Sequence, residues 1–317
     1  MAMIRDEYLR RLIDNAYVDL YLSANDGHRI YWPWRMMPPA ESSRAYRNAC
    51  EVFIIDSEPQ SPHVGNREVL DEAERVGADM ALLADYFPFE VYEEELDPEE
   101  DPEAWAAYQQ ILREYGDAYS ASVHSVRRGI ELAETHPFEG EIILPLQAPH
   151  ADAVRELPAH DRYAIGGLKD AAASDYRRVD AARSVREAAP DAWIHGLGWG
   201  ATEGVVAAVH ERPQLLDSVD YSTPIQTAIG GTDPGDERMS VQAAKAGAKL
   251  IEDLRLFSPY LSDPPSPPSS EQQRLVTDGG GLGEITHSVT CRNCGKETFA
   301  FERDCVNCGV NRWRGNA

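Results

Sequence analysis

The sequence predicts an α/β fold, a TIM-like (β/α)8 barrel with a small C-terminal zinc ribbon. Short apolar runs alternate with longer helical segments between residues 51 and 257, which is typical of parallel βα units. Several of these runs end in a polar residue, and the carboxyl ends of barrel strands are where active sites form. Four of the five cysteines occur as two CxxC pairs near the C-terminus, a spacing typical of zinc sites.

The first fifty residues are expected to lead into the barrel. Residues 6–16 have helical character, and the aromatic run 30–34, interrupted by Pro33, predicts a strand across the barrel floor or a lid. About six clear strands follow residue 50, so an eight-stranded barrel needs two strands from this segment. An open doubly wound sheet is the alternative, although the chain has no GxGxxG or GKS/T loop of the nucleotide-binding folds.

The apolar runs after residue 50 are short and rich in β-branched residues, as buried strands are. The predicted strands are residues 51–55, 78–84, 141–146, 163–165, 193–197 and 215–220. The predicted helices are residues 69–76, 101–135 with a break at Gly116, 151–157, 170–189, 201–211 and 239–257. Asp101 and Pro102 suit the N-cap and first position of a helix. The acidic segment 90–103 is expected to be a solvated loop.

Composition divides the chain into three parts. Residues 1–257 form the predicted barrel with its N-terminal segment, and residues 258–284 are rich in Pro, Ser and Gly, which is typical of a linker. Residues 285–317 contain the cysteine pairs and form a predicted zinc-binding module with four cysteine ligands. There is no internal repeat of fixed period.

The metal ligands are the most specific motif in the chain. They are Cys291, Cys294, Cys305 and Cys308. Four thiolates suit a tetrahedral, structural Zn²⁺, on which so small a module would depend for folding. Residues 285–317 carry five Lys or Arg against three acidic residues, so both a nucleic-acid contact and a purely structural ribbon remain open.

The chain is strongly acidic, with a formal net charge of −24, and 26 of its 30 basic residues are arginines. This composition indicates a highly hydrated surface or a high-salt cytoplasm, as in haloarchaea or their viruses. Molar salt shortens the Debye length to about 3 Å, so local arginines could still bind nucleic acid. We find no signal peptide and no apolar run that could span a membrane. A cytoplasmic protein is expected, in the host cytoplasm if the protein is viral.

Three predicted strands deliver aspartates to one end of the barrel. They are Asp56, Asp85 and Asp220, and Gln147 and the Gly166-Gly167 pair follow two further strands. Paired carboxylates can exchange a group at a sugar carbon, one attacking the anomeric carbon and the other moving the proton of the leaving group. These residues are therefore the predicted active site.

The local motifs around these residues resemble the tRNA-guanine transglycosylase superfamily over roughly residues 51–228. The motifs are DSEPQS, ALLADYFPF, LPLQ, YAIGGL and HGLGWG followed by LLDSVDYSTP. The resemblance implies that Asp220 is the nucleophile and Asp56 the general acid/base. It assigns the contacts to the base to Asp85, Gln147, Gly166, Gly167 and His195.

The sequence departs from the family's pattern where the polynucleotide and base are held. Glu58-Pro59 replaces a Gly-Gly pair, and Gln60 replaces an aromatic residue that stacks on the base. His195 replaces an apolar residue, so it either stacks on the base or is a structural, hydrogen-bonded histidine. Ile225-Gln226 replaces a Thr-Arg pair that grips tRNA. The cysteine spacing also differs from the family's CxCxxC zinc site.

These departures do not affect the predicted catalytic residues. In this respect the sequence resembles the viral and phage branch of the superfamily, which modifies DNA. The resemblance implies a guanine transglycosylase that replaces guanine in DNA by a free 7-deazaguanine of the preQ0 or preQ1 type, as protection against restriction. The alternatives are the same exchange on tRNA, and a catalytically inactive zinc-ribbon protein that binds nucleic acid. A hydrolase that only excises a base is a further option. The oligomeric state cannot be predicted from the sequence.

Overall fold

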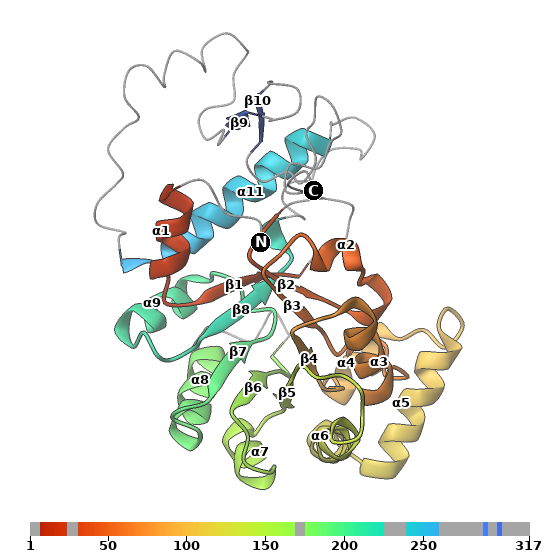
Figure 1. Ribbon diagram of the computed structural model, residues 1–317. Coiled ribbons are helices and arrows are strands. Elements are labelled where there is room, and N and C mark those ends of the chain that lie inside the picture. Colours follow the sequence, from red (N-terminus) through yellow and green to blue (C-terminus); the bar gives the residue numbers. More distant parts are fainter. Residues whose placement is uncertain are drawn as a thin grey trace.

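A closed barrel of eight parallel strands forms the centre of the protein (Figure 1). The computed structural model describes residues 7–23, 31–168, 175–224, 239–259, 288–290 and 297–299. The strands are β1 (Asp19–Leu22), β2 (Trp34–Met37), β3 (Val52–Ile55), β4 (Met80–Leu82), β5 (Glu141–Leu146), β6 (Arg162–Ile165), β7 (Trp193–Gly196) and β8 (Ser218–Tyr221). Because β1 pairs in parallel with both β2 and β8, the sheet closes on itself. The barrel prediction is confirmed and the open sheet is excluded.

Helices surround the barrel and cover the outer face of its strands (Figure 1). They are α1 (Glu7–Asn15), α2 (Arg44–Arg47), α3 (Asn66–Val76), α4 (Phe89–Glu95), α5 (Pro102–Tyr115), α6 (Ala118–Ala133), α7 (His150–Glu156), α8 (Asp175–Ala188), α9 (Glu203–Glu211) and α11 (Met239–Leu256), with a short 3₁₀ helix, η1 (Pro39–Glu41). The Asp101 side chain accepts a hydrogen bond from the Ala104 N–H at 3.0 Å, as its predicted N-cap position requires. Gly116 ends α5 with a φ of 80°, so the predicted break is confirmed.

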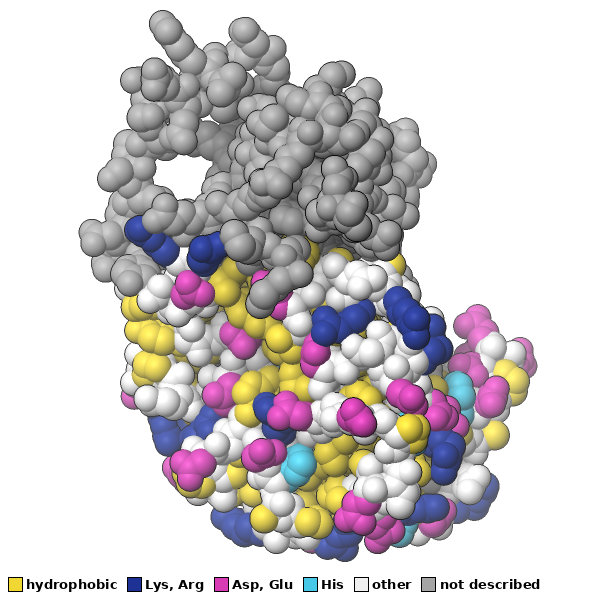
Figure 2. All heavy atoms as spheres, viewed as in Figure 1, with side chains coloured by type: hydrophobic (Ala, Val, Ile, Leu, Met, Phe, Trp, Pro, Cys, Tyr) yellow, Lys and Arg dark blue, Asp and Glu magenta, His cyan; other side chains and the backbone are white. Residues whose placement is uncertain are grey.

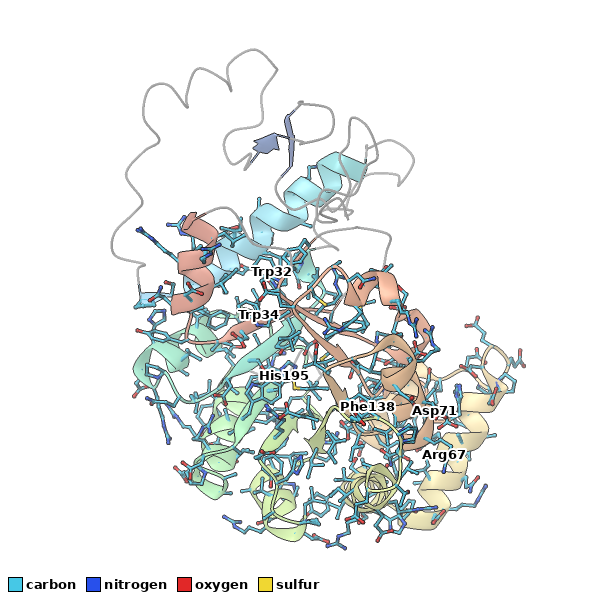
Figure 3. The ribbon with its side chains drawn as sticks, in the orientation of Figure 1. Trp32, Trp34, Arg67, Asp71, Phe138 and His195 are labelled. Atoms are coloured by element: carbon cyan, nitrogen blue, oxygen red, sulfur yellow. The ribbon has the colours of Figure 1, made fainter. Side chains whose placement is uncertain are left out.

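The second strand begins later than the aromatic run 30–34 suggested. Pro33 has no N–H to give to a ladder, and its carbonyl instead accepts from the N–H groups of Glu51 and Val52. Trp32 therefore lies before the strand, where its indole N–H donates to the Leu20 carbonyl at 2.6 Å. Trp32 and Trp34 meet edge to face beside β1 (Figure 3). The aromatic run thus anchors β2 to β1 and is not a lid.

The acidic insertion is not the predicted loop, because its first part is helix α4. Aromatic residues three apart, Phe89 and Tyr92, share one face of this helix and are buried. They belong to a separate apolar cluster made of Phe87, Phe89, Tyr92, Tyr108, Ile111 and Ala121. The glutamates of α4 point to solvent. The many acidic residues suggested a loop. Phe89 and Tyr92 instead pack the helix against α5 and α6.

The strand β8 begins at Ser218, three residues later than predicted. Leu215 and Leu216 are buried in the preceding turn, and Asp217 there accepts hydrogen bonds from Arg186 and from the Ile194 N–H. Asp220 is consequently the third residue of the strand, and its carbonyl accepts from the Gly200 N–H at 3.2 Å. The shift matters little for the site, since Asp220 still lies at the carboxyl end of its strand.

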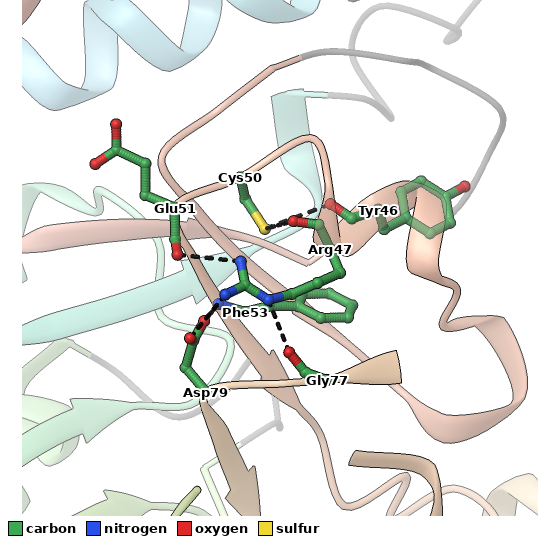
Figure 4. A network of polar contacts seen from close by, with 7 residues as sticks. All are labelled: Tyr46, Arg47, Cys50, Glu51, Phe53, Gly77 and Asp79. Carbon is green, nitrogen blue, oxygen red and sulfur yellow. Dashed lines mark hydrogen bonds and ion pairs between the residues drawn. The ribbon is translucent and has the colours of Figure 1, made fainter. Parts of the chain in front are cut away.

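A polar network ties β3 and β4 together at their amino ends (Figure 4). The Arg47 guanidinium donates to the carbonyls of Gly77 and Glu51 and to Asp79 Oδ1 at 2.8 Å. Asp79 Oδ2 accepts from the Phe53 N–H at 2.8 Å. These contacts lie at the amino ends of the strands, opposite the end where active sites form in barrels of this kind.

Beyond the barrel, the structure describes one antiparallel pair, β9 (Ser288–Thr290) and β10 (Glu297–Phe299). The predicted linker lies almost wholly outside the described residues, and so do all four predicted zinc ligands. Among the described residues, none of the helices combines the length and apolarity that a membrane span requires. On the face shown in Figure 2, acidic and basic side chains are interspersed over the described part of the barrel.

Candidate active site at the carboxyl ends of the strands

The three predicted aspartates lie at the same end of the barrel. Asp56 directly follows β3, Asp85 follows β4, and Asp220 lies near the end of β8. The negative charges of Asp220 and Asp85 both raise the pKa of Asp56, Asp220 more strongly. The barrel therefore brings together the carboxylates that the sequence placed on separate strands.

The pKa of the Asp56 carboxyl group is strongly raised. Burial raises its pKa to about 7, and the nearby charges of Asp220, Asp85 and Glu58 add to the effect. A hydrogen bond of 2.7 Å from the Ser57 N–H to Asp56 Oδ1 opposes the rise. A carboxyl group with this pKa exists in both protonation states near neutral pH, as a general acid/base must.

The turn after Asp56 contains a residue in an unusual backbone conformation. Glu58 has a φ of 54°, in the left-handed region that glycine favours. Its side chain is 8% exposed, and Oε2 accepts from the Ala40 N–H at 3.3 Å. The turn thus keeps the conformation that a Gly-Gly pair would permit, although the sequence has Glu58-Pro59. The backbone strain at Glu58 and its buried carboxyl group therefore both lie close to Asp56.

Asp220 is held through one carboxylate oxygen. Asp220 Oδ1 accepts a hydrogen bond from the Gly198 N–H at 2.6 Å and lies 3.1 Å from His195 Nε2. Gly198 can offer its N–H here because it has a φ of 69° in the turn after β7. Asp220 Oδ2 has no hydrogen-bond partner among the described residues. The described residues thus fix the side chain through Oδ1 alone.

His195 lies inside the barrel and not at an open surface (Figure 3). It is 1% exposed, with its ring stacked on Trp193 at 5.6 Å and meeting the edge of Tyr21 at 5.6 Å. Its Nδ1 lies 2.7 Å from Ser218 Oγ, so both ring nitrogens have partners. This geometry favours the structural interpretation of His195 over stacking on a base.

Asp85 and Gln147 form a buried pair. Gln147 Nε2 lies 3.0 and 2.9 Å from the two Asp85 carboxylate oxygens, and Ser122 Oγ donates to Oδ1 at 2.9 Å. Burial raises the pKa of Asp85 to about 6. Hydrogen bonds from Gln147, the Tyr86 backbone and Ser122 lower the pKa and so oppose this rise. The group is therefore mainly ionised at pH 7 and can accept hydrogen bonds.

The glycine pair after β6 fits closely against these side chains. A Cβ on Gly166 would lie 2.6 Å from Asp85 Oδ2, and one on Gly167 would lie 2.1 Å from Gln147 Oε1. Gly167 also has a φ of 70°, and the Gly166 carbonyl lies 2.9 Å from His150 Nε2. The structure thus brings together Asp85, Gln147 and both glycines, as the motifs predicted.

Sequence analysis missed Tyr92, which connects two loops of the site. Its hydroxyl donates to the Pro59 carbonyl at 2.6 Å and accepts from the Phe87 N–H at 3.1 Å. One side chain from α4 therefore joins the loop after Asp56 to the loop after Asp85. The aromatic spacing within 89–92 was the available signal. Ser122 and Ser218 were also missed, and no local pattern indicates them.

The predicted zinc ligands lie outside the described residues, so only their sequence context can be tested. Cys291 and Cys294 fall in the segment between β9 and β10, which pair as an antiparallel hairpin. Such a hairpin is a suitable support for a CxxC pair, and four thiolates suit zinc. No group of three or more potential metal ligands occurs among the described residues.

Comparisons with known proteins identify no family. Neither a scan against protein-family models nor a search of curated proteins gives a match. The motifs and the geometry of the site are therefore the basis for a function.

Proposed function

We propose that the protein is a guanine transglycosylase that exchanges guanine in DNA for a free 7-deazaguanine base. One observation carries the proposal. Asp56, with a pKa raised to about 7, lies near the charge of Asp220, whose Oδ1 takes both of the hydrogen bonds that the described residues make to this carboxylate. This is the acid/base and nucleophile pair that retaining exchange at a sugar carbon requires.

In the first step, Asp220 Oδ2 attacks C1′ of the nucleotide and the bond from C1′ to N9 of guanine breaks. The Asp56 carboxyl group gives its proton to the departing base, which leaves as neutral guanine. In the second step, the Asp56 carboxylate removes the N9 proton of the incoming base. N9 attacks C1′, and the ester bond to Asp220 breaks. Both steps balance without a redox cofactor.

The Asp85 and Gln147 pair supports guanine-like bases as substrates. A guanine edge offers N1–H and amino N–H donors, which a buried carboxylate can accept. A 7-deazaguanine keeps the same edge and differs at the opposite side of the base, so one set of contacts serves both. In this proposal the base takes over hydrogen bonds that Gln147 and Ser122 now make to Asp85.

DNA is proposed as the polymer because the sequence lacks the Thr-Arg pair of the tRNA enzymes after Pro224. On the visible barrel face, charges of both signs are mixed (Figure 2). We therefore propose that local arginines and the proposed zinc ribbon bind the polymer. A base in a duplex must first leave the stack, at a cost of a few kcal/mol. Protection of viral DNA against restriction is the proposed benefit.

The test is the incorporation of radiolabelled guanine in molar salt, with duplex DNA, single-stranded DNA and tRNA compared side by side. We expect label in DNA, no incorporation by Asp220→Asn, and a loss of at least about 100-fold for Asp56→Asn. The control is Asp191→Asn, the same change at an exposed aspartate. Label in tRNA alone would replace DNA by tRNA as substrate. No label in any polymer, or an abasic product, would overturn base exchange.

A further inference from the structure

We propose that His195 is a positioning residue that orients the Asp220 carboxylate, and that it does not bind the base. The inference rests on the proposed function in that Asp220 is taken as the nucleophile. It deepens that function by assigning the residue that prepares Asp220 for attack.

The contact with Asp220 fixes the direction of one hydrogen bond. A carboxylate can only accept, so His195 Nε2 carries the proton and donates to Asp220 Oδ1 across 3.1 Å. In the neutral ring Nδ1 then accepts, and its partner at 2.7 Å is Ser218 Oγ, which can donate. Ser218, His195 and Asp220 thus form one chain of hydrogen bonds in which each group has a defined role.

The strand register explains why these three residues meet. Ser218 lies opposite His195 in the β7–β8 ladder, and Asp220 is two residues beyond Ser218 on the same face of β8. Tyr21 lies opposite Asp220 in the β1–β8 ladder and contacts the His195 ring. The neighbouring strands therefore hold the imidazole in place before any substrate arrives.

The result is a carboxylate with its two oxygens in different roles. Oδ1 receives both the His195 and the Gly198 hydrogen bonds. No described residue bonds to Oδ2, which in this proposal attacks the sugar carbon, and rotation of the side chain would break both bonds to Oδ1. Misplacement of a reacting group by about 1 Å can cost about 100-fold in rate, so the loss of the His195 donor should lower kcat. KM for the base should not change, because the ring is buried against protein.

Three substitutions separate positioning from stacking. His195→Gln keeps a donor near the Nε2 position but loses the ring. His195→Phe keeps a ring but loses the donor. His195→Asn keeps a donor near Nδ1 but does not reach Asp220. We expect kcat to fall about 100-fold for Phe and Asn and less than about 10-fold for Gln. KM for the base should stay within about twofold in all three variants.

The opposite ranking would overturn the proposal. If His195 stacks on the base, His195→Phe should remain active and His195→Gln should raise KM. Thermal unfolding of each variant shows which of them are folded. If His195→Phe does not fold, the comparison of Gln with Asn decides, since both are small polar replacements.

A second measurement does not depend on base exchange. The ¹⁵N chemical shifts of the His195 ring in the full-length protein report its tautomer. We expect a neutral ring protonated at Nε2, which changes its shifts in Ser218→Ala. A neutral ring protonated only at Nδ1 would exclude donation to Asp220 and overturn the inference. If the protein exchanges no base but shows the Nε2 tautomer, the proposed function fails while the hydrogen bond from His195 to Asp220 stands.

Discussion

At the scale of single residues, the site depends on what surrounds each carboxyl group. Asp56 and Asp220 are the same residue type at equivalent ends of two strands, yet their partners differ. Asp56 receives one hydrogen bond from the described residues, and burial, together with three acidic neighbours, raises its pKa. Asp220 receives a backbone N–H and lies beside an imidazole. Such differences can assign an acid and a nucleophile to two identical side chains.

The raised pKa of Asp56 predicts how exchange depends on pH. The first step needs the protonated form, which predominates below a pKa of about 7 and disappears above it. We therefore expect kcat/KM for DNA to fall as pH rises through about 7. Carbon-13 NMR of the carboxyl groups gives the pKa directly, and Asp220→Asn should lower it because one negative neighbour is lost. An Asp56 pKa near 4 in the unchanged protein would contradict this assignment.

Which residues would enter the site could be predicted, but not what they contact. The aspartates, Gln147 and the glycine pair end apolar runs, and parallel strands deliver their ends to one place. Ser122 reaches Asp85 from α6, and Ser218 reaches His195 across the ladder. Neither serine belongs to a local pattern, because both contacts depend on how distant segments pack.

At the scale of elements, helix α4 stabilises the site from outside the barrel. Tyr92 is the only described residue of this helix whose side chain bonds to both site loops, through Pro59 and Phe87. The sequence suggested a loop because nine acidic residues lie within 90–103. Helix formation here depends on the aromatic cluster and not on the charge pattern.

Removal of the Tyr92 hydroxyl should loosen both loops at once. We expect Tyr92→Phe to lower the free energy of unfolding by about 1–2 kcal/mol, since a buried hydroxyl that both donates and accepts is lost. Exchange should slow as Asp56 and Asp85 become less well placed. Urea unfolding and steady-state kinetics measure the two effects.

The matched control is Tyr108→Phe. Tyr108 belongs to the same cluster, but its hydroxyl bonds to Glu93, on the exposed face of α4, at 3.1 Å. Equal losses of activity in the two variants would show that the cluster acts only through general stability. A loss confined to Tyr92→Phe would support the role of α4 in holding the site.

At the scale of the whole molecule, the barrel and the cysteine module are expected to be separable. Among the strands that the structure describes, the β9–β10 sheet shares no ladder with the barrel. We predict about one zinc ion per chain by elemental analysis, lost in Cys291→Ser and retained in Cys50→Ser, which changes a cysteine buried in the barrel. Chelation should leave the thermal transition of the barrel in place. A full zinc content in Cys291→Ser would exclude that ligand.

The barrel itself should lose stability as the pH rises above 5. Burial raises the pKa of Asp19 to about 7, with a further contribution from Asp217, and Asp56 and Asp85 reach about 7 and about 6. In the unfolded chain these groups ionise near pH 4. The folded state therefore binds more protons between these values, so its stability falls as pH rises through the folded pKa values. We expect a decrease of roughly 7 kcal/mol between pH 5 and pH 8, since each pH unit between 5 and a folded pKa contributes about 1.4 kcal/mol.

Urea unfolding in molar salt measures this decrease, because salt screens the repulsion among the surface charges of a chain with a net charge of −24. Asp19→Asn and Asp56→Asn should each make the protein less sensitive to pH, whereas Asp191→Asn should leave the dependence unchanged. Asp19 lies at the amino end of β1, away from the strand ends that carry the site. A flatter profile in Asp19→Asn with exchange retained would therefore separate the stability effect from the chemistry. Stability that rises from pH 5 to pH 8 would contradict the raised pKa values of all three aspartates.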